Sequence, residues 1–246
     1  MGASRDNFIK FPRTPHLFGS TGTDDDRRLD QKASEEFLAS SSLIAEEKLD
    51  GTNGGIHFTS AGQMILQCRG HELTEGAHPQ YDLFKQWAAA KRTALEAILR
   101  DRYVLYGEWL YARHTVHYLR LPHFLICIDL YDKAISAFLD RGSRLGLVQD
   151  SGIPGVPLLR RGPLTPESVS TLIGQSRFGS RFENPVTGVV DDLMEGIYFR
   201  TEFKGLVTGR AKFVRPEFVH RARESHDWRH RSVVPNELAA GVDIWR

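Results

Sequence analysis

The chain is poor in cysteine and has almost no net charge. Its 246 residues include two cysteines, and the formal net charge is +1. Cys68 and Cys127 each lie inside an apolar run, which favours reduced, buried thiols in a cytoplasmic protein over a disulfide framework. No cysteines are spaced as in a structural zinc site. Because there is no global basic charge, any nucleic-acid binding must come from a local patch.

Segments for targeting or for crossing a membrane are also missing from the sequence pattern. The opening residues, MGASRDNFIKFPRTPH, contain no apolar stretch of the kind that a secretory signal needs. No run approaches the roughly 18 apolar residues that are required to span a bilayer. We therefore expect no membrane partner and a cytoplasmic location.

Hydrophobic periodicity predicts an α+β fold with mostly antiparallel strands. A short helix is expected over 32–39 and a longer one over 81–100, where neither Pro nor Gly interrupts the helical spacing. A third helix is expected to start at Thr165, a hydroxyl cap followed by proline and an acid. The segment 140–162, with its Gly and Pro, gives the weakest prediction. Strands are expected where apolar residues alternate or run together, at 43–47, 54–59, 63–69, 103–110, 124–131, 196–200 and 206–214.

Residues 1–246 are expected to form a single domain. No stretch resembles an interdomain linker, and about thirty residues after Val214 are too few for a second ordinary domain. Residues 216–246 are interpreted as a short basic tail that carries Trp228. Basic residues beside an aromatic ring can hold a single nucleic-acid strand by charge and stacking. A charged helix that docks through Trp228 is the equal alternative.

The strongest chemical signal is the string KLDGTN at residues 48–53, directly after a predicted strand. A lysine nucleophile must be deprotonated and aimed at its target, and the position where a strand enters a turn can aim Lys48. Gly51 lets the backbone approach a ligand closely. Asp50 can orient a sugar hydroxyl or a hydrated metal ion. The alternative interpretation is an exposed turn with a charged pair.

Further charged residues lie in or at the end of predicted strands. Glu108, in the string YGEW, stands among apolar and aromatic residues, where an unpaired acid would be costly. Arg69 ends the second hairpin strand, and its guanidinium suits phosphate, although a solvated arginine at a turn is the alternative. Arg210 and Lys212 share one face of the last strand because side chains alternate. A solvated pair of strand cations is the alternative there.

The order of these motifs resembles that of ATP-dependent RNA ligases. These belong to the covalent lysine nucleotidyltransferase superfamily, and their nucleophile motif reads K-x-D/H-G-T-N. The resemblance extends from about residue 11 to residue 215 and includes two more strings, FLICID at 124–129 and EGIYFR at 195–200. It implies a nucleotidyltransferase (ATP-grasp-like adenylation) domain with mostly antiparallel sheets and flanking helices.

The resemblance also implies a role for each motif residue. Lys48 attacks the α-phosphorus of ATP and carries AMP as a phosphoramidate, while Asn53 serves the later chemistry that joins RNA. Glu108 holds the ribose, and Arg69 contacts the ribose or the RNA 5′-phosphate. Ile128 stands where the family usually has an aromatic residue, so an aliphatic contact with adenine is expected. The residues implied to contact the nucleotide are Lys48, Asp50, Gly51, Arg69, Glu108, Ile128, Glu195 and Lys212.

The implied metal is Mg²⁺ or Mn²⁺, held by Glu195 through water, with Asp50 as a second candidate ligand. Magnesium keeps several of its waters and uses few carboxylates, so a sparse ligand set is expected. Lys212 is implied to contact the α-phosphate, and its charge is expected to lower the pKa of Lys48. Arg210 replaces the commoner lysine of the family motif and keeps its charge, so it is implied to stabilise phosphate charge as well.

The string KFPRTPHL at residues 10–17 also resembles the start of bacterial members of this group. Pro12 and Pro15 stiffen the segment, which could thereby present Arg13 and His16 to a phosphate. The alternative is an N-terminal arm that packs on the domain. The resemblance assigns neither Arg13 nor His16 a firm role.

The implied function is ATP-dependent RNA ligation, in which AMP passes from Lys48 to an RNA 5′-phosphate that is then sealed to a 3′-OH. Nicks, broken tRNA loops and single-stranded ends are alternative substrates. Family ligases usually append an RNA-binding or OB domain, and none is evident here, so a partner protein is a candidate source of RNA affinity. Two other functions stay open: a capping-type guanylyltransferase, and a nucleotide- or RNA-binding module without catalysis. Nucleotide preference and covalent transfer distinguish them.

Overall fold

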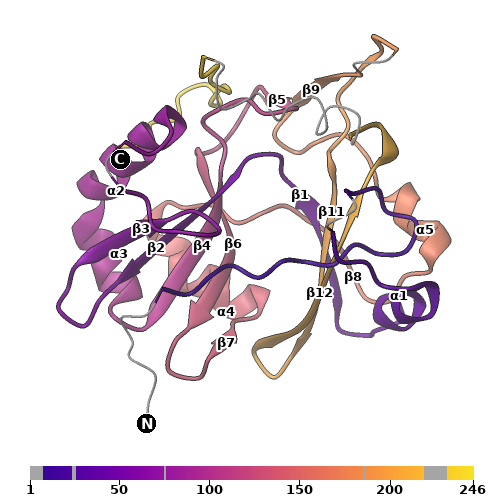
Figure 1. Cartoon of the computed structure of the whole chain (residues 1–246), viewed down its shortest axis with the longest axis horizontal. Coiled ribbons are helices and arrows are strands. Elements are labelled where there is room, and N and C mark those ends of the chain that lie inside the picture. Colours follow the sequence, from indigo (N-terminus) through magenta and orange to yellow (C-terminus); the bar gives the residue numbers. More distant parts are fainter. Residues whose placement is uncertain (1–7, 24–25, 75, 185–186, 219–231) are drawn as a thin grey trace.

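Two antiparallel sheets form the framework of the molecule and meet across a central cavity (Figure 1). The computed structural model describes residues 8–23, 26–74, 76–184, 187–218 and 232–246. The four-stranded sheet has the order β12 (Leu206–Val214), β11 (Gly196–Phe203), β1 (Leu43–Lys48) and β8 (Leu158–Arg161). The five-stranded sheet has the order β3 (Met64–Gln67), β2 (Thr52–Phe58), β4 (Tyr103–Trp109), β6 (Leu125–Asp132) and β7 (Ala137–Phe138). A small third sheet joins β10 (Val190–Asp191), β9 (Ser180–Glu183) and β5 (His117–Tyr118).

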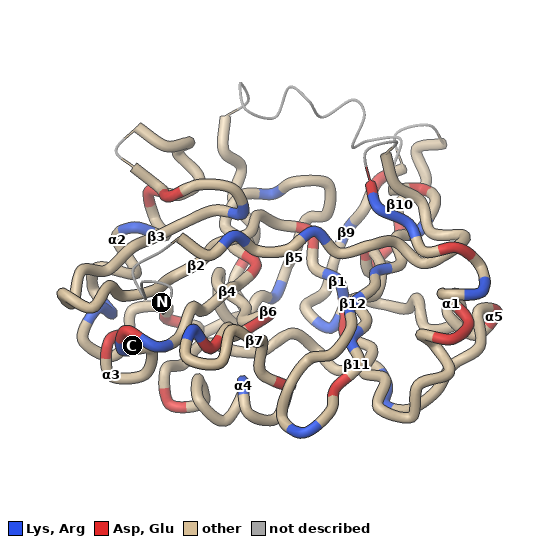
Figure 2. Tube along the Cα trace, turned by 60° about the horizontal axis from the view of Figure 1, so that its bottom comes forward, with Lys and Arg blue, Asp and Glu red and all other residues tan. Residues whose placement is uncertain are grey.

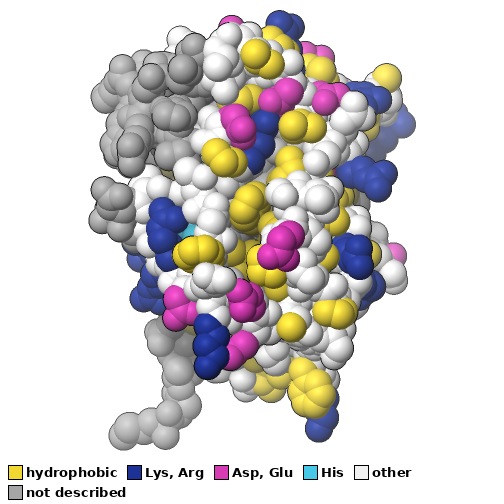
Figure 3. All heavy atoms as spheres, turned by 90° about the vertical axis from the view of Figure 1, so that its right-hand side faces the viewer, with side chains coloured by type: hydrophobic (Ala, Val, Ile, Leu, Met, Phe, Trp, Pro, Cys, Tyr) yellow, Lys and Arg dark blue, Asp and Glu magenta, His cyan; other side chains and the backbone are white. Residues whose placement is uncertain are grey.

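The helices cover the outer sides of the two large sheets (Figure 1). Helices α1 and α5 contact each other and bury Leu38 and Val169 in the core cluster of the four-stranded sheet. Helices α2 and α3 bury Phe84 and Leu95 against the five-stranded sheet. On the face that carries α1 and α5, hydrophobic and charged side chains are interspersed (Figure 3). The helices are α1 (Gln31–Leu38), α2 (Asp82–Ala90), α3 (Arg92–Leu99), α4 (Arg141–Val148) and α5 (Pro166–Thr171).

Apart from the helix over 81–100, the elements predicted from periodicity are confirmed within a few residues, and so is the antiparallel pairing. The third helix begins after Thr165, whose N–H donates to the Ser168 hydroxyl, as expected of a capped start. Segment 140–162 contains more structure than its sequence predicts, because it holds α4 and β8. Helix α4 is capped by Asp140, whose carboxylate accepts from the Ser143 N–H.

The prediction of one long helix over 81–100 is wrong, because the chain leaves helical geometry at Lys91 (φ −94°, ψ 6°). The two shorter helices pack against different partners. Trp87 on α2 donates its indole N–H to the carbonyl of Ile244, whereas α3 contacts β2 and β4. Tertiary packing therefore sets the break, and no Gly or Pro marks it in the sequence.

The two cysteines differ in their surroundings. Cys127 is buried in the core, as expected, but Cys68 is only half-buried and lies beside the central cavity. Its Sγ lies 3.3 Å from Nδ1 of His71, so the prediction of two buried thiols is wrong for Cys68. Among the residues that the structure describes, no helix has both the length and the apolar character needed to cross a membrane.

The C-terminal residues 232–246 pack on the domain and do not form a separate tail. Ile244 joins the main core cluster, and the Asn236 side chain accepts from the Tyr118 N–H and donates to the carbonyl of Leu110. The backbone N–H of Leu121 donates to the backbone carbonyl of Glu237. Trp228, with the basic residues around it, lies outside the described residues, so its predicted role stays a prediction.

A buried cluster of charges connects the two large sheets. Glu46 on β1 contacts Arg141, Arg144 at 2.6 Å and Arg200 at 2.7 Å. Arg200 on β11 also contacts Asp129 on β6 at 2.7 Å. Glu46, Arg144, Arg200 and Asp129 have fully buried side chains. The neighbouring arginines hold the pKa values of both carboxyl groups below their usual range, against the effect of burial.

We expect the free energy of unfolding to fall by about 3–5 kcal/mol in Glu46→Gln, because the change leaves buried guanidinium groups without their counter-charge. Urea denaturation followed by circular dichroism measures this. Glu36→Gln is the matched control, since Glu36 pairs with Lys32 on the exposed surface of α1, and we expect a change of at most about 0.5 kcal/mol there. Equal stability of the two variants would contradict the prediction.

Candidate active site

A cavity of about 1030 Å³ lies between the two sheets. Strands β1, β11 and β12 line it on one side, and β2, β4 and the loop after β3 line it on the other. The N-terminal arm, defined as residues 8–23 and 26–30, crosses the front of both sheets (Figure 1) and supplies a further wall. Basic positions gather where β1, β11 and β12 run side by side (Figure 2).

Cross-strand register explains which side chains of the four-stranded sheet reach the cavity. Paired residues of antiparallel strands lie on the same face, and the faces alternate along each strand. Lys48 is opposite Gly196, and in the next row on this face Tyr198 is opposite Lys212. Arg210 stands one row further from Lys48. The rows on this face are Lys48, Gly196, Val214; Glu46, Tyr198, Lys212; and Ile44, Arg200, Arg210.

Lys48 forms a short ion pair with Glu195. Its Nζ lies 2.6 Å from both carboxylate oxygens, and the two side chains are 24% and 9% exposed. Gly196, next to Glu195, permits this geometry because a Cβ there would lie 2.1 Å from the carbonyl oxygen of Phe213. Strands β11 and β12 can therefore approach closely only with glycine at this position.

The electrostatics around Lys48 differ from the expectation. Burial lowers the pKa of Lys48, but the carboxylates of Glu195, Glu108 and Asp50 outweigh burial and raise it above its ordinary value. The net shift of the Lys48 pKa is thus upward in this state of the protein, and the predicted lowering by Lys212 stays a prediction. Burial does lower the pKa of Lys212 itself, and the nearby charge of Lys48 adds to that effect.

Two carboxyl groups at the centre of the site have strongly raised pKa values. Burial raises the pKa of Glu195 to about 7, against the opposing effect of Lys48. Burial also raises the pKa of Glu108 to about 7, and its Oε1 accepts from the Gly51 N–H at 3.1 Å. Perturbed carboxyl groups in a cavity are typical of catalytic and binding sites.

Asn53 is opposite Glu108 in the register of β2 and β4, and both side chains line the cavity. Asn53 is 7% exposed, and neither atom of its amide has a hydrogen-bond partner among the described residues. Burying an amide without a partner is costly. This orphaned amide therefore points to a ligand that supplies hydrogen bonds.

Asp50 and Gly51 serve the local structure. Asp50 Oδ2 accepts from the N–H groups of Thr115 and Val116 at 2.7 Å each, and the residue does not line the cavity. Its predicted contact with a sugar or a metal ion has no support in this placement. Gly51 lines the cavity, but its close approach is to β4, where a Cβ would lie 2.7 Å from the Trp109 carbonyl.

Lys212 reaches the cavity, whereas Arg210 does not. Lys212 Nζ lies 3.5 Å from Asp26 on the N-terminal arm. Arg210 pairs with Asp129 at 3.2 Å and lies over the ring of Phe138. Alternation in the sequence predicted that Arg210 and Lys212 share one face of β12, and the observed register confirms this. The role of Arg210 at a phosphate is not supported, because Asp129 already holds its charge.

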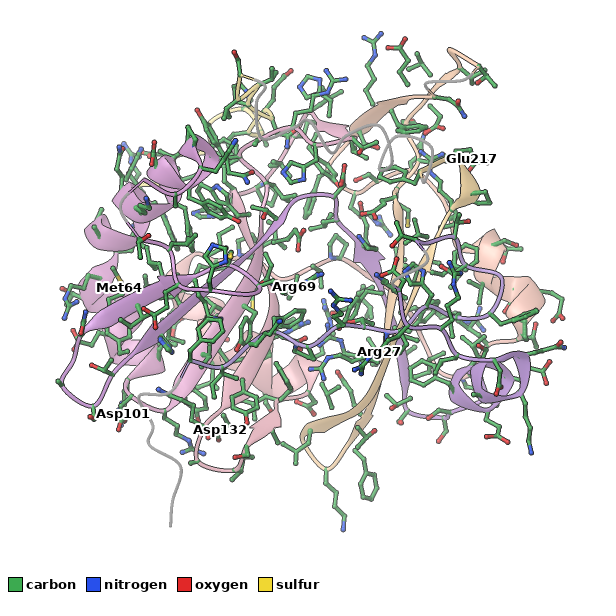
Figure 4. All side chains as sticks on the ribbon, viewed as in Figure 1. Arg27, Met64, Arg69, Asp101, Asp132 and Glu217 are labelled. Carbon is green, nitrogen blue, oxygen red and sulfur yellow. The ribbon has the colours of Figure 1, made fainter. Side chains whose placement is uncertain are left out.

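The cavity also has an apolar part and a second basic side. Ile128 lines it together with Val156 and Tyr198, so the position expected to contact a base does face the cavity. Arg69 lies on the side of the five-stranded sheet, whereas Arg27 of the N-terminal arm lies on the side of the four-stranded sheet (Figure 4). The site thus combines an apolar slot with a half-buried lysine and two basic sides.

The family model for RNA ligases matches residues 41–214. The chain belongs to the RNA ligase family. No curated protein matches it. The matched region of this RNA ligase family member contains β1 with Lys48, β11 and β12 with Lys212, and therefore both sheets that form the cavity.

Solved structures of RNA ligases share the nucleotidyltransferase fold of this family member. Naegleria gruberi RNA ligase with PPi aligns with a TM-score of 0.54 and 18% identity, covering 89% of this chain and 64% of that one. A lysine-to-alanine mutant of that ligase with ATP and Mn gives 0.53 and 17%, covering 88% and 63%. An archaeal ATP-dependent RNA ligase gives 0.50 and 15%, covering 85% and 48%. This chain thus spans less than two thirds of the length of each of these ligases.

The residues present fit a hydrated divalent cation. The described residues contain no cluster of three or more acidic, His or Cys side chains that could enclose a bare metal ion. Glu195 and Glu108 nevertheless bring two carboxyl groups to the cavity of this RNA ligase family member. Magnesium retains most of its waters and needs few carboxylates, so Glu195 is a suitable ligand through water.

Several cavity residues were not predicted from the sequence. Alternation from Gly196 along EGIYFR could have indicated Tyr198 and Arg200, since all three share a face. Arg27 and Asp26 carry no such signal, because they lie in a loop whose position depends on tertiary contacts. His16, for which the sequence left a phosphate contact and packing of the arm as alternatives, is buried beside the cavity, and burial and the charge of Lys212 lower its pKa to about 4.

We expect Glu195→Gln to lower the pKa of Lys48, because it removes the carboxylate that opposes the effect of burial most strongly. A fall by about one pH unit or more is expected. Competitive acylation of Lys48 across pH in metal-free buffer, read by mass spectrometry, measures the midpoint. Glu36→Gln serves as the control on the exposed surface. An unchanged midpoint in Glu195→Gln would show that Glu195 does not hold the charge of Lys48.

Proposed function

We propose that this protein is an ATP-dependent RNA ligase that forms a lysyl-AMP intermediate at Lys48. The observation that carries the proposal is the placement of a half-buried lysine between Glu195 and Lys212 in a cavity large enough for a nucleotide. Glu195 contacts Lys48 directly, and Lys212 adds positive charge to the same cavity, which suits a phosphate. Family membership and the shared fold support the same conclusion.

In the first step, Lys48 Nζ forms a bond to the α-phosphorus of ATP. The bond from that phosphorus to the β-phosphate oxygen breaks, and pyrophosphate leaves with the electron pair. The ammonium of Lys48 must lose a proton first, and Glu195 is in direct hydrogen-bond contact with it. Because the carboxylates of Glu195, Glu108 and Asp50 hold that proton on Lys48, its loss requires that the ion pair with Glu195 be broken.

A divalent cation bound through Glu195 would stabilise the charge that develops on the phosphate oxygens and would draw Glu195 away from Lys48. The RNA ligase structures from Naegleria gruberi that were solved with ATP and Mn support the choice of ATP and a divalent metal. In this chain, Lys212 adds positive charge beside the same phosphate, and Glu108 accepts from a ribose hydroxyl.

In the second step the AMP moves from Lys48 to an RNA 5′-phosphate, and the P–N bond breaks as a P–O–P bond forms. In the third step the RNA 3′-OH attacks that 5′-phosphate, and AMP leaves. Asn53 on β2 and Arg69 in the loop after β3 line the cavity from the side of the five-stranded sheet. We assign both to these RNA steps, Arg69 as the ligand of the 5′-phosphate and Asn53 through its unpaired amide. A partner protein remains our proposal for additional RNA affinity.

The decisive experiment is label transfer from ATP carrying ³²P at the α-phosphate. With Mg²⁺, we expect denatured wild-type protein to retain the label and Lys48→Ala to retain none, because no other cavity lysine contacts Glu195. Lys204→Ala, at the exposed β11–β12 turn, is the charge-matched control and should label normally. Labelling by GTP alone would favour the guanylyltransferase, and ATP binding without label would favour the binding module.

Asn53→Ala tests the assignment of the later steps. We expect this variant to form lysyl-AMP within about threefold of the wild-type rate and to seal a 5′-phosphorylated RNA about 10- to 100-fold more slowly. The reason is the loss of one or two hydrogen bonds in a dry site. Quenched-flow gel assays on a nicked RNA duplex measure both rates. A matching loss in both steps would place Asn53 at the nucleotide instead.

A further inference from the structure

The turn that follows β1 is held by residues that do not line the cavity. Its backbone N–H at Asp50 donates to the Tyr118 hydroxyl at 2.8 Å. The Asp50 carboxylate accepts from the N–H groups of Thr115 and Val116 at 2.7 Å each. All three partners belong to the connecting segment, defined as residues 110–121, which follows β4 and contains β5. The position of the turn therefore depends on where the connecting segment lies.

The side chain of Asn236 fixes the connecting segment. Its Oδ1 accepts from the Tyr118 N–H at 2.9 Å, and its Nδ2 donates to the carbonyl of Leu110 at 2.7 Å. Asn236 is only 4% exposed, so both polar ends of its amide are satisfied inside the protein. Because Leu110 directly follows β4, this one side chain sets the place of Tyr118 relative to the five-stranded sheet.

Asn236 belongs to the C-terminal segment, defined as residues 232–246, which pairs with the connecting segment through its backbone. The chain then ends beside α2, where the Trp87 indole N–H donates to the carbonyl of Ile244 (Figure 1). The C-terminal segment lies outside the region that the family model matches, and none of its residues lines the cavity. The backbone bonds run from the N–H groups to the carbonyls of Arg113 and Val234, Asn236 and Tyr111, Glu237 and Tyr118, and Leu121 and Glu237.

Tyr118 can transmit this position because its side chain is held rigidly. It is fully buried in the main core cluster, where close packing leaves little room for movement. Burial also raises the pKa of Tyr118 well above its ordinary value, so the hydroxyl stays neutral and keeps accepting from the Asp50 N–H. Asp50 is two residues from Lys48. A misplacement of about 1 Å at a reacting group can cost about 100-fold in rate.

We propose that Asn236 and Tyr118 are positioning residues for Lys48. Asn236 places Tyr118, and Tyr118 holds the turn at Asp50. The turn, once held, directs the amino group of Lys48 to the phosphate that it attacks. The C-terminal segment thereby takes part in the formation of lysyl-AMP from outside the cavity. This inference rests on the proposed function.

Single-turnover formation of lysyl-AMP across ATP concentrations tests the proposal with Tyr118→Phe and Asn236→Ala. We expect the rate constant at saturating ATP to fall about 10- to 100-fold, because Lys48 is less well placed. The ATP concentration that gives half of the maximal rate should stay within about twofold, since no side chain of the cavity changes. A loss of stability alone would lower the fraction of protein that reacts and leave the rate constant unchanged, and that result overturns the proposal.

Trp87→Phe is the matched control. It removes a buried hydrogen bond to the same C-terminal segment, at Ile244, and should form lysyl-AMP at the wild-type rate. The double variant of Tyr118→Phe and Asn236→Ala should be about as slow as the slower single variant, because both residues act through one path. Equal slowing in Trp87→Phe, or losses that multiply in the double variant, would overturn the proposal. Thermal unfolding confirms that each variant is folded.

Amide hydrogen exchange read by NMR tests the same path without catalysis. We expect the Asp50 N–H to exchange at least about tenfold faster in Asn236→Ala than in wild-type protein, and Trp87→Phe to leave its exchange unchanged. Unchanged exchange in Asn236→Ala overturns the proposal. If wild-type protein takes no label from ATP, the proposed function fails, and the exchange still decides whether Asn236 holds the turn.

Discussion

The fold depends on the buried contact of Glu46 with three arginines. Glu46 lies on the same face of β1 as Lys48, two residues away, and Arg200 extends the contact to Asp129 on the five-stranded sheet. Buried charges are costly unless their partners are held in place, so this cluster favours one arrangement of the two sheets. That arrangement places Lys48 of one sheet opposite Glu108 of the other. The position of Lys48 is thus a consequence of charge pairing between the two sheets.

Pairing of opposite charges also sets the protonation state of the lysines at the cavity. Lys48 and Lys212 each have an acidic partner, Glu195 and Asp26, and the carboxylates near Lys48 hold it in its charged form. Without substrates Lys48 therefore stays protonated, and a protonated lysine is not a nucleophile. Phosphates that bind the lysines and a cation that binds the carboxylates would separate both pairs. Substrate binding and activation of the nucleophile are coupled in this way.

Local sequence patterns predicted much of the fold and the centre of the site. Most strands of the two large sheets follow from alternation, although β7 and β8 do not, and Lys48, Glu195 and Lys212 follow from motifs within single elements. The break at Lys91, the placement of the N-terminal arm and the pairing of Arg210 with Asp129 do not, because each depends on residues far away in the chain. Asp50 is a further example of a contact that local sequence does not reveal. Its place in the motif suggested that it binds a sugar or a metal ion, but its carboxylate accepts from the N–H groups of Thr115 and Val116, which are distant in the chain.

The ion pair between Lys48 and Glu195 joins residues that are 147 positions apart. The strands of the five-stranded sheet all come from residues 52–138. In contrast, β1 lies in one sheet with β11 and β12, which come about 150 residues later in the chain. Contacts between distant segments form slowly because loop closure costs entropy before any contact compensates for it. We therefore expect the four-stranded sheet to be the later of the two to assemble. A chain in which only the five-stranded sheet had formed would hold no ion pair between Lys48 and Glu195.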